Sequence, residues 1–443
     1  MVPAELLQQL QQLVKEQQEQ LNSQAQTIEA LSSRVDQLED ETDEAKTAAT
    51  QATTTANQAT TTASQATSTA TQAQNTVQQV AGEVQRAGGN EADQVVTSGN
   101  DKVKLAISGH INRAVNVAAD GEDTKVYFVD NDVSNTRIRF VGTGEVAENT
   151  TLGTQLEIGF SPNNSFDVSQ DDESPDDFVD TRHAEVFVRN DSYGQLFFGK
   201  GQAAADDTAE FDLSLVGGPI MYSGIADPVG GLQFTNDDGD LTGLTVGDAF
   251  FNFDGDRQDR VMYETPVFLT GMQLAVSAGD DQRYDVALKW GFDYNDWTGV
   301  DIGPITTLGA IAFHDPNEDN VDGRISGSFS GLHNPTGLSV TLAGGGEFND
   351  EKEDPYNVYS KLAWDTFFFD LGQTGFGVDF TYTQNQSGED DEGMSVGLAA
   401  IQLIEDFGVE IYAQARWYEL DRSSNAESVN DIFVGTVGTR VKF

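Results

Sequence analysis

The sequence has no cysteine, so a disulfide framework and a thiolate metal site are both excluded, while the cellular compartment is left open. It is also poor in basic residues: 24 lysines and arginines face 73 aspartates and glutamates, giving a formal charge of −49. A general nucleic-acid binder needs Lys and Arg to neutralise phosphates, so this class is excluded. The acid excess favours cations as partners and solubility in a salty medium.

No run of 18 apolar residues occurs, so a transmembrane helix is not expected. This absence leaves a membrane β-barrel open, because transmembrane strands carry a much weaker, alternating signal. The N-terminus, MVPAELLQQL, lacks a basic segment followed by an apolar one. If the protein is exported, we expect that the sequence is that of a processed or re-engineered chain.

No aromatic residue precedes Tyr127, and this shift in composition predicts two regions. Residues 1–90 contain 11 acids and 4 bases, and residues 91–443 contain 62 and 20. Gly88 and Gly89 make a plausible hinge. We predict a coiled coil over residues 1–90, a linker over 91–101 and a second domain over 102–443.

The first region keeps a strict spacing of alternating threes and fours from Leu7 to Ala87. Of the 24 positions in this register, 21 are apolar, although residues 48–73 resemble a linker or a glycosylated stalk in composition. A flexible linker has no reason to keep such a phase, so the spacing predicts a coiled coil. At 1.5 Å per residue, some 80 residues would form a rod roughly 120 Å long.

The seam of this coiled coil changes from Leu, Ile and Val to Ala and then back to Val. Alanine layers bring helices close but bury little area, so the middle of the rod should be thin and weak. The seam does not fix the number of helices. The seam positions that carry this prediction are Leu31, Val35, Leu38, Ala52, Ala56, Ala59, Ala63, Ala66, Val77 and Val80.

Beyond residue 100 the apolar period becomes two, which predicts strands. In TRIRFVG, for example, Arg137 and Arg139 share one face and Ile138 and Phe140 the other. Sixteen such segments occur, near residues 103–118, 125–142, 150–161, 181–190, 195–202, 258–267, 270–279, 282–294, 302–314, 321–331, 336–347, 356–366, 373–384, 392–403, 407–419 and 430–443.

Short turns such as NDSYG and long acidic loops such as SQDDESPDD alternate between these segments. An even strand number, about ten residues per strand and this alternation of loop lengths are typical of an outer-membrane barrel. The predicted fold class is an all-β transmembrane barrel of about 16 antiparallel strands, preceded by a long α-helical coiled coil.

SGHINRAV, DNDVSNTRIRF, FFGKGQ, RVMYETP and a C-terminal Phe on an alternating strand resemble the trimeric general porins of Gram-negative bacteria. The resemblance covers roughly residues 100–443. The added N-terminal coiled coil resembles the DcaP-like porins. This resemblance implies a homotrimer, and a threefold coiled coil would fit it.

Residues 203–256 separate two strands by a segment too long for an idle loop. By resemblance it is the third loop of porins, which narrows the pore, although the usual Pro-x-Glu-x-Phe-Gly signature is absent. We expect its acids to face bases of the wall, giving a charge filter. Besides His183, the predicted constriction residues are Arg113, Arg137, Arg139, Arg189, Lys200, Asp206, Asp207, Glu210, Asp212 and Arg260. The alternative is that each basic side chain is simply a solvated part of the barrel wall.

DPNEDNVDG at 315–323 offers alternate oxygen ligands, partly like a calcium loop. The candidate ligands are Asp315, Asn317, Asp319 and Asp322, and the alternative is a solvated acidic loop. No cofactor is otherwise required. The sequence has four histidines, none of them in a GxSxG or HExxH context, so we expect no enzymatic activity.

The sequence therefore predicts an outer-membrane porin for ions and small hydrophilic solutes, with a preference for cations and a periplasmic coiled coil. Expected partners are further copies of the chain, outer-membrane lipid and lipopolysaccharide, solutes and cations, and peptidoglycan as a candidate, but not nucleic acid. The alternative is a structural envelope tether or a surface fibre or adhesin, whose barrel acts mainly as a membrane anchor.

Overall fold

A computed structural model describes residues 12, 15, 19, 22, 96–97 and 102–443, apart from 176–178, 270, 294–304, 319, 351 and 424–425. The chain divides into two compact units, Met1–Ala70 and Thr71–Phe443. In the first unit, the four described residues are helical and exposed. No helix among the described residues is long and apolar enough to cross a membrane. The ten predicted seam residues lie outside the described residues.

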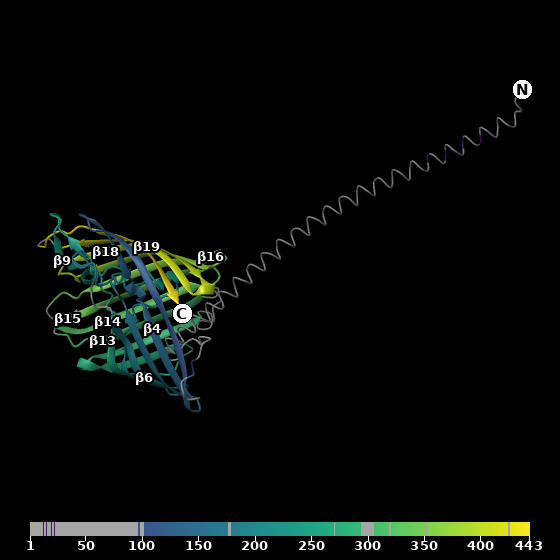
Figure 1. Cartoon of the computed structure of the whole chain (residues 1–443), viewed down its shortest axis with the longest axis horizontal. Helices are drawn as coiled ribbons and strands as arrows, with labels where there is room; N and C mark the ends of the chain where they lie inside the picture. The colour runs from purple at the N-terminus through teal and green to yellow at the C-terminus, as the bar shows by residue number, and fades with distance from the viewer. Residues whose placement is uncertain are drawn as a thin grey trace, which may run out of the picture. The chain divides into compact units, whose positions relative to one another are not determined.

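The second unit is an antiparallel sheet that closes into a barrel (Figure 1). A two-residue strand, β1 (Val96–Thr97), pairs with the start of β2. The wall strands are β2 (Lys104–Ala119), β3 (Thr124–Asp130), β4 (Arg137–Ala147), β5 (Thr150–Phe160), β6 (Val179–Asn190), β7 (Gly194–Gln202), β10 (Arg257–Glu264), β11 (Met272–Gly279), β12 (Tyr284–Asp293), β13 (Ile305–Asp315), β14 (Val321–His333), β15 (Leu338–Asn349), β16 (Tyr356–Phe369), β17 (Gly372–Gln384), β18 (Glu392–Ile404), β19 (Val409–Asp421) and β20 (Ile432–Lys442).

Closure occurs where the first wall strand meets the last. β2 pairs with β20 from His110 opposite Lys442 to Ala119 opposite Phe433. On its other edge, β2 pairs with β3 along one half and with β4 along the other half. β3 and β4 together therefore count as one strand of the barrel wall. Counted in this way, the wall has 16 strands over the described residues, which confirms the predicted fold class.

The sequence predicts one uninterrupted strand at 125–142. The structure instead has β3 and β4, because residues 131–136 bulge out of the hydrogen-bonded ladder between the strands. The buried Asp130 carboxylate closes the bulge by accepting hydrogen bonds from the Thr136 N–H at 2.8 Å and the Thr136 hydroxyl at 2.5 Å. The buried Asn131 amide donates to the carbonyl of Pro219, 88 residues away. A period-two pattern cannot reveal such a distant partner.

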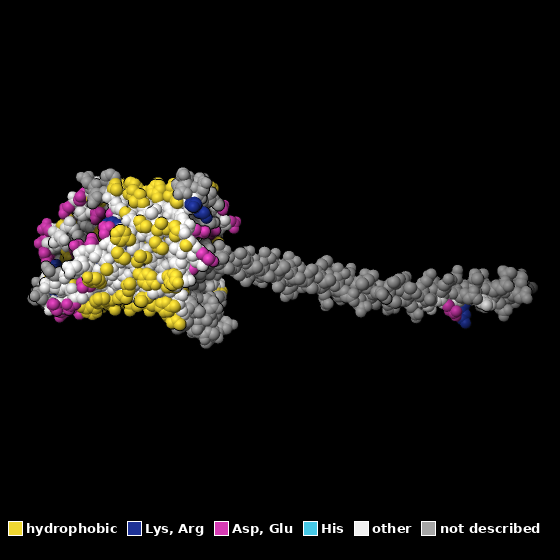
Figure 2. Space-filling model, turned by 90° about the horizontal axis from the view of Figure 1, so that it is seen from below, with side chains coloured by type: hydrophobic (Ala, Val, Ile, Leu, Met, Phe, Trp, Pro, Cys, Tyr) yellow, Lys and Arg dark blue, Asp and Glu magenta, His cyan; other side chains and the backbone are white. Residues whose placement is uncertain are grey.

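The outer surface of the barrel is apolar along the middle of the strands (Figure 2). In β17, Phe376, Val378 and Phe380 are about 40% exposed (39%, 41% and 42%), whereas the intervening Asp379 is buried. Aromatic pairs lie at both ends of the wall, for example Trp364 with Phe368 and Tyr356 with Tyr382. An apolar band flanked by aromatic residues is the surface of a barrel that spans a membrane.

The two ends of the barrel differ in their connections. At one end the strands are joined by short turns such as residues 191–193 and 370–371, and β2 begins and β20 ends there. At the other end the connections are longer, as at residues 385–391 and 422–431. Acidic side chains gather at the rim that these longer loops form (Figure 2).

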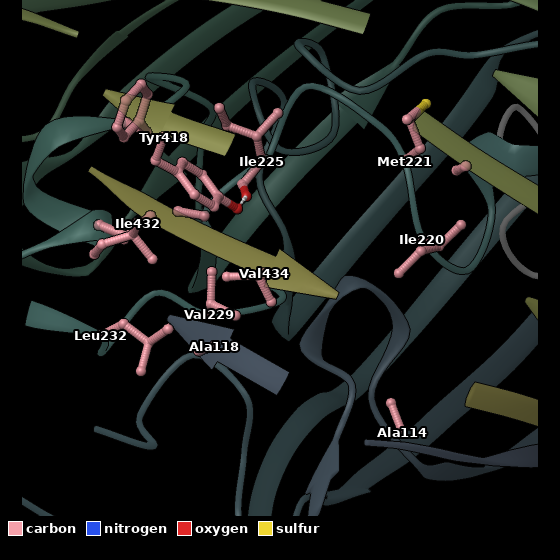
Figure 3. Close-up of a cluster of buried hydrophobic side chains, with 14 of the residues drawn as sticks. Ala114, Ala118, Ile220, Met221, Ile225, Val229, Leu232, Tyr418, Ile432 and Val434 are labelled. Carbon is pink, nitrogen blue, oxygen red and sulfur yellow. Dashed lines mark hydrogen bonds between the residues drawn. The ribbon is translucent and has the colours of Figure 1, made fainter. Parts of the chain in front are cut away.

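Residues 203–256 connect β7 to β10 and fold into the barrel. This segment contains the 3-10 turn η2 (Leu215–Gly217), the hairpin β8 (Gln233–Thr235) and β9 (Leu241–Thr245), and the short helix α2 (Val246–Ala249). Its apolar residues, including Ile220, Met221 and Ile225, pack against inward-facing Ala and Tyr side chains of β2, β16, β18 and β19 (Figure 3). The molecule therefore has a buried apolar core inside the barrel, made by the loop and the wall together.

Candidate functional site

The backbone of the inserted loop is held by side chains of the inner wall. The carbonyls of Ile220 and Met221 accept hydrogen bonds from the side chains of Gln414 at 3.0 Å and Lys361 at 2.8 Å. The carbonyl of Ile225 accepts one from the Tyr418 hydroxyl at 2.6 Å, drawn as a dashed line in Figure 3. Irregular backbone inside a membrane barrel must find polar partners, and the wall supplies them. The loop therefore has a fixed position.

The first arm of the loop is held by serines of β14. The Ser328 hydroxyl donates to the carbonyl of Thr208 at 2.7 Å and accepts from the N–H of Phe211 at 3.0 Å. The Ser330 hydroxyl accepts from the N–H of Leu213 at 3.0 Å. These contacts fix the backbone from which the acidic side chains at the start of the loop extend.

A cavity of about 840 Å³ remains between the loop and β4, β5 and β6. Its lining extends from Lys442 and Phe443, at the short-turn end, to Phe166 and Phe251 in the long-loop segments. We name this cavity the passage. On the other side of the lumen, apolar side chains of the loop pack against the wall.

One side of the passage is basic. Arg137 and Arg139 project from β4 and Arg182 from β6, and all three surround Glu157 of β5, which is fully buried. Arg182 Nε donates to Glu157 Oε1 at 2.8 Å, Arg139 Nε donates to Glu157 Oε2, and Arg137 Nη1 lies 3.6 Å from Oε1. One carboxylate thus orders three guanidinium groups, and the cluster keeps a net positive charge.

The opposite side is acidic and belongs to the loop. Asp206, Asp207 and Glu210 come from its start and Asp254 from its end. Carboxylate oxygens of Asp206, Asp207 and Asp254 lie within 4.8 Å of one another. The two sides meet where Arg257 Nε is 4.0 Å from Asp206 Oδ2.

Asp254 joins the two ends of the loop. Its carboxylate accepts hydrogen bonds from the N–H of Asp207 at 2.6 Å and of Ala209 at 2.8 Å. Asp207 adopts a left-handed backbone conformation with φ of 66°, which turns the chain at this point. Burial, followed by the neighbouring Asp206 and Asp207 carboxylates, raises the pKa of Asp254 well above its ordinary value.

Glu210 is the acidic residue of the loop whose negative charge is least compensated by neighbouring groups. Its pKa is raised well above the ordinary value by burial and then by the surrounding carboxylates, Asp254 first among them. Among the described residues, no hydrogen bond or ion pair to its carboxylate is formed. Its environment therefore attracts positive charge.

Arg137, Arg139, Asp206, Asp207 and Glu210 of the predicted constriction residues line the passage, as does His183. Eight further lining residues with charge were missed by the sequence reasoning: Asp132, Glu157, Arg182, Asp227, Asp254, Asp256, Arg257 and Lys442. Asp132 lies on the bulge in the wall, and Asp254 and Arg257 meet the start of the loop only because the loop returns on itself. Arg182 could have been found, because it follows a predicted strand boundary beside His183.

Two other predicted constriction residues are neutralised elsewhere. Arg260 is buried in the wall, where its Nη2 donates to Glu185 at 2.7 Å and its Nε donates to the carbonyl of Gln202 at 2.8 Å. Asp212 is paired with Lys361 beneath the loop. Both are structural contacts away from the passage lining.

The remaining three bases also lie elsewhere. Arg113 and Lys200 have the strand phase of the exposed residues of β2 and β7, and Arg113 Nη1 donates to the carbonyl of Pro162 at 2.8 Å. Arg189 lies near a short turn, with its Nε donating to Gln195 at 2.9 Å. The wall register of each residue decides its place.

Of the predicted calcium ligands, Asp315 ends β13, Asn317 lies in the connection and Asp322 lies in β14. The Asp315 carboxylate accepts the N–H of Asn317 at 2.9 Å, and Asp322 is exposed. Asp319 lies outside the described residues. The neighbouring Glu318 is paired with Arg324 at 2.8 Å.

The family described as "Alanine-zipper, major outer membrane lipoprotein" matches residues 26–87. This range contains all ten predicted seam residues. The match confirms the N-terminal coiled coil that the alternating spacing predicts. No curated protein matches the chain.

Among solved structures, the chain is similar to the anion-selective porin from Comamonas acidovorans, with 14% identity over 77% of this chain and 100% of that chain and a TM-score of 0.52. It is also similar to the outer membrane channel DcaP of Acinetobacter baumannii (10% identity, 79% and 100% covered, TM-score 0.49) and to OmpF of Salmonella typhi (12%, 79% and 100%, 0.49). At such identities the likeness concerns the fold: the barrel has the fold of the porins.

Proposed function

We propose that the chain is an outer-membrane porin that allows passive diffusion of ions and small hydrophilic solutes. The observation that carries this proposal is the passage, a charged cavity of about 840 Å³ inside a closed barrel whose outer surface is apolar. A wall that is apolar outside and a charged cavity inside support permeation by polar solutes.

We further propose that the passage prefers cations. Eight acidic and five basic side chains line it, and the rim of long loops is acidic as well. A negative lining concentrates cations and repels anions. Reversal potentials across a planar bilayer under a KCl gradient test this: K⁺ should permeate more readily than Cl⁻, and a preference for Cl⁻ would contradict the proposal.

The contacts of two histidines also favour a channel over an enzyme, because they hold the imidazole rings in structural interactions. His110 Nε2 donates to the carbonyl of Asn135 at 2.9 Å, so this nitrogen cannot serve as a base for the nearby Ser134 hydroxyl. His183 Nδ1 lies 2.9 Å from the Glu185 carboxylate, within the wall. We therefore propose that the protein is not an enzyme.

We propose a periplasmic position for the coiled coil and a homotrimeric assembly in the outer membrane, in contact with lipid and lipopolysaccharide. The support is that β2 begins at the end with short turns, which is the periplasmic end in outer-membrane barrels. Chemical cross-linking of the purified protein should give a trimer. Peptidoglycan as a partner of the rod and calcium at residues 315–323 stay predictions.

In the alternative function, a surface fibre or an envelope tether, the coiled coil is the functional part and the barrel acts mainly as a membrane anchor. Protease treatment of intact cells separates the fibre from the porin. A surface fibre would lose its first 90 residues, whereas a periplasmic rod would be protected. An anchor without a transport role would in addition show no conductance in the bilayer.

A further inference from the structure

The outer wall of the barrel has a hollow of about 580 Å³ on strands β12–β16. Its sides are formed by apolar side chains that are exposed on the outward phase of their strands, including Ile311, Ile325, Phe329, Leu342 and Phe348. None of the described residues lines both this hollow and the passage. The hollow is therefore a separate feature that opens to the surroundings of the barrel.

Two glycines leave the floor of the hollow bare. Gly327 and Gly344 lie directly opposite each other on β14 and β15, and a Cβ on either would first meet a backbone oxygen of the next strand, 2.8 Å away. By contrast, the Trp290 ring lies over Gly309, its cross-strand partner on the same wall. Among the described residues, no ring comes so close to Gly327 or Gly344. Because an unfilled hollow forfeits packing contacts, a group from outside the chain gains by covering the two glycines.

The hollow is continuous with the apolar band of the barrel and has the length of one leaflet. From Leu342 to Phe348 the strand rises about 20 Å, and at a tilt of about 45° this crosses roughly half of a hydrocarbon core about 30 Å thick. Tyr356 lines the hollow at the end near the long loops, where its hydroxyl donates to Gln384 at 2.7 Å. An apolar hollow that extends from the middle of the wall to one rim fits an acyl chain of the leaflet on that side.

The charges at this rim select a head group for such a chain. Of the described lining residues, only Glu347 and Asp354 are charged, and both are acidic. Glu347 is paired with Arg324 at 2.6 Å, whereas Asp354 is exposed at the end near the long loops. An exposed carboxylate attracts an ammonium group and repels an anionic head group.

We propose that the hollow binds one acyl chain of a glycerophospholipid whose head group carries an ammonium, as in phosphatidylethanolamine. The chain covers Gly327 and Gly344, and the ammonium lies at Asp354. The inference needs only the membrane-spanning barrel, so it goes beyond the proposed function and does not depend on solutes crossing the passage.

Quenching of Trp290 by lipids with brominated acyl chains tests this proposal, because Trp290 lines the hollow and bromine quenches an indole that it contacts. The full-length protein carries Trp290 as its sole tryptophan, through Trp297→Phe, Trp364→Phe and Trp417→Phe, and is titrated with brominated phosphatidylethanolamine in dodecyl maltoside micelles. Quenching should saturate at one lipid for each chain.

A sister protein that keeps only Trp364 provides the comparison, since Trp364 is exposed on the same wall but does not line the hollow. Its quenching should increase with the lipid content of the micelle without saturating. Phosphatidylglycerol with the same chains is anionic, and half-saturation at Trp290 should need about 1.5- to fivefold more of it, the range of an exposed ion pair.

Three variants assign the binding to its residues. Ile311→Phe places a ring beside Gly327, its cross-strand partner, and should abolish the saturable quenching of Trp290. Ile411→Phe is the matched control, because Ile411 has the same exposure on the outward phase of β19 (46% against 47% for Ile311) and should keep it. Asp354→Asn should keep the binding but remove the preference for phosphatidylethanolamine. Far-UV circular dichroism shows that each variant has folded.

Several outcomes would overturn the proposal. Quenching of Trp290 that follows the lipid content of the micelle, as for Trp364, means that the hollow is not a site. No quenching of Trp290 means that protein, such as a second copy of the chain, covers the hollow. Saturable quenching that survives Ile311→Phe places the lipid elsewhere, and equal binding of the two lipids removes the role of Asp354.

Discussion

The inserted loop borders two sectors of the lumen, one packed with apolar side chains and one lined by charged side chains. Where residues 215–234 face β16–β20 and β2, apolar side chains fill the space and wall side chains bind the carbonyls of the loop. Where residues 206–210 face β4–β6, charged side chains remain around an open cavity. In the filled sector wall side chains bind the backbone of the loop, whereas in the open sector charged side chains of the loop and the wall line a cavity. The residues that hold the loop in place are thus distinct from the charged residues that line the cavity.

The strongest way to break this division is to remove a buried charge from the filled sector. Lys361→Met leaves Asp212 without its cation and the carbonyl of Met221 without its donor. Removing one partner of a buried pair costs about 3–5 kcal/mol, and we expect a loss of unfolding free energy of this size. Tryptophan fluorescence during urea unfolding in lipid vesicles measures it.

The same substitution at an exposed pair provides the control. Lys125 lies 3.4 Å from Glu173, and the two side chains are 35% and 60% exposed. Lys125→Met should cost about 1 kcal/mol or less. Equal losses in the two variants would show that the filled sector does not depend on its buried charges.

A smaller effect is expected at the boundary between the sectors. Ser328→Ala removes the two hydrogen bonds that hold the arm of the loop at Thr208 and Phe211. Each hydrogen bond contributes about 0.5–1.5 kcal/mol, so we expect a loss of roughly 1–3 kcal/mol and a less uniform single-channel conductance. Ser360→Ala on the outward phase of β16 is the control and should change neither quantity.

The smallest effect concerns the open sector and pH. Because the pKa values of Asp254 and Glu210 are raised, both carboxyls take up protons at a higher pH than ordinary acids do. Acidification should lower the K⁺ over Cl⁻ permeability ratio by about two- to fivefold before the exposed rim acids titrate. The neutral forms are favoured by the fold, so stability should be greatest below the ordinary carboxyl pKa and decrease as pH rises through the raised values.

Bilayer reversal potentials measured as the pH is lowered from alkaline to acidic test this change. Glu210→Gln should flatten the profile, whereas Glu173→Gln at the exposed rim should leave its shape intact. A ratio that falls only in the range of ordinary carboxyls would show that the acids of the loop titrate as if they were in water.

The sequence predicts the wall well and the passage only in part, for physical reasons. The strands follow from a period of two that one buried face imposes, as Arg137 and Arg139 beside Ile138 and Phe140 illustrate. That both arginines would share a face followed from local geometry alone.

The missed residues depend on long-range contacts. Asp254 reaches the N–H of Asp207 only after the loop has packed against the wall, and Arg257 meets Asp206 for the same reason. Asp132 enters the passage because Asn131 of the bulge binds the carbonyl of Pro219. No spacing rule encodes contacts between residues so far apart in the chain.

The inserted loop has a consequence for how the barrel is assembled. The carbonyl of Gly218 accepts a hydrogen bond from Arg440 of β20 at 3.2 Å, and that of Pro228 accepts one from Asn116 of β2 at 2.7 Å. These two wall strands are the ones that join to close the barrel. The loop thus bridges the closure of the barrel from within, so its docking stabilises the pairing of the first and last strands.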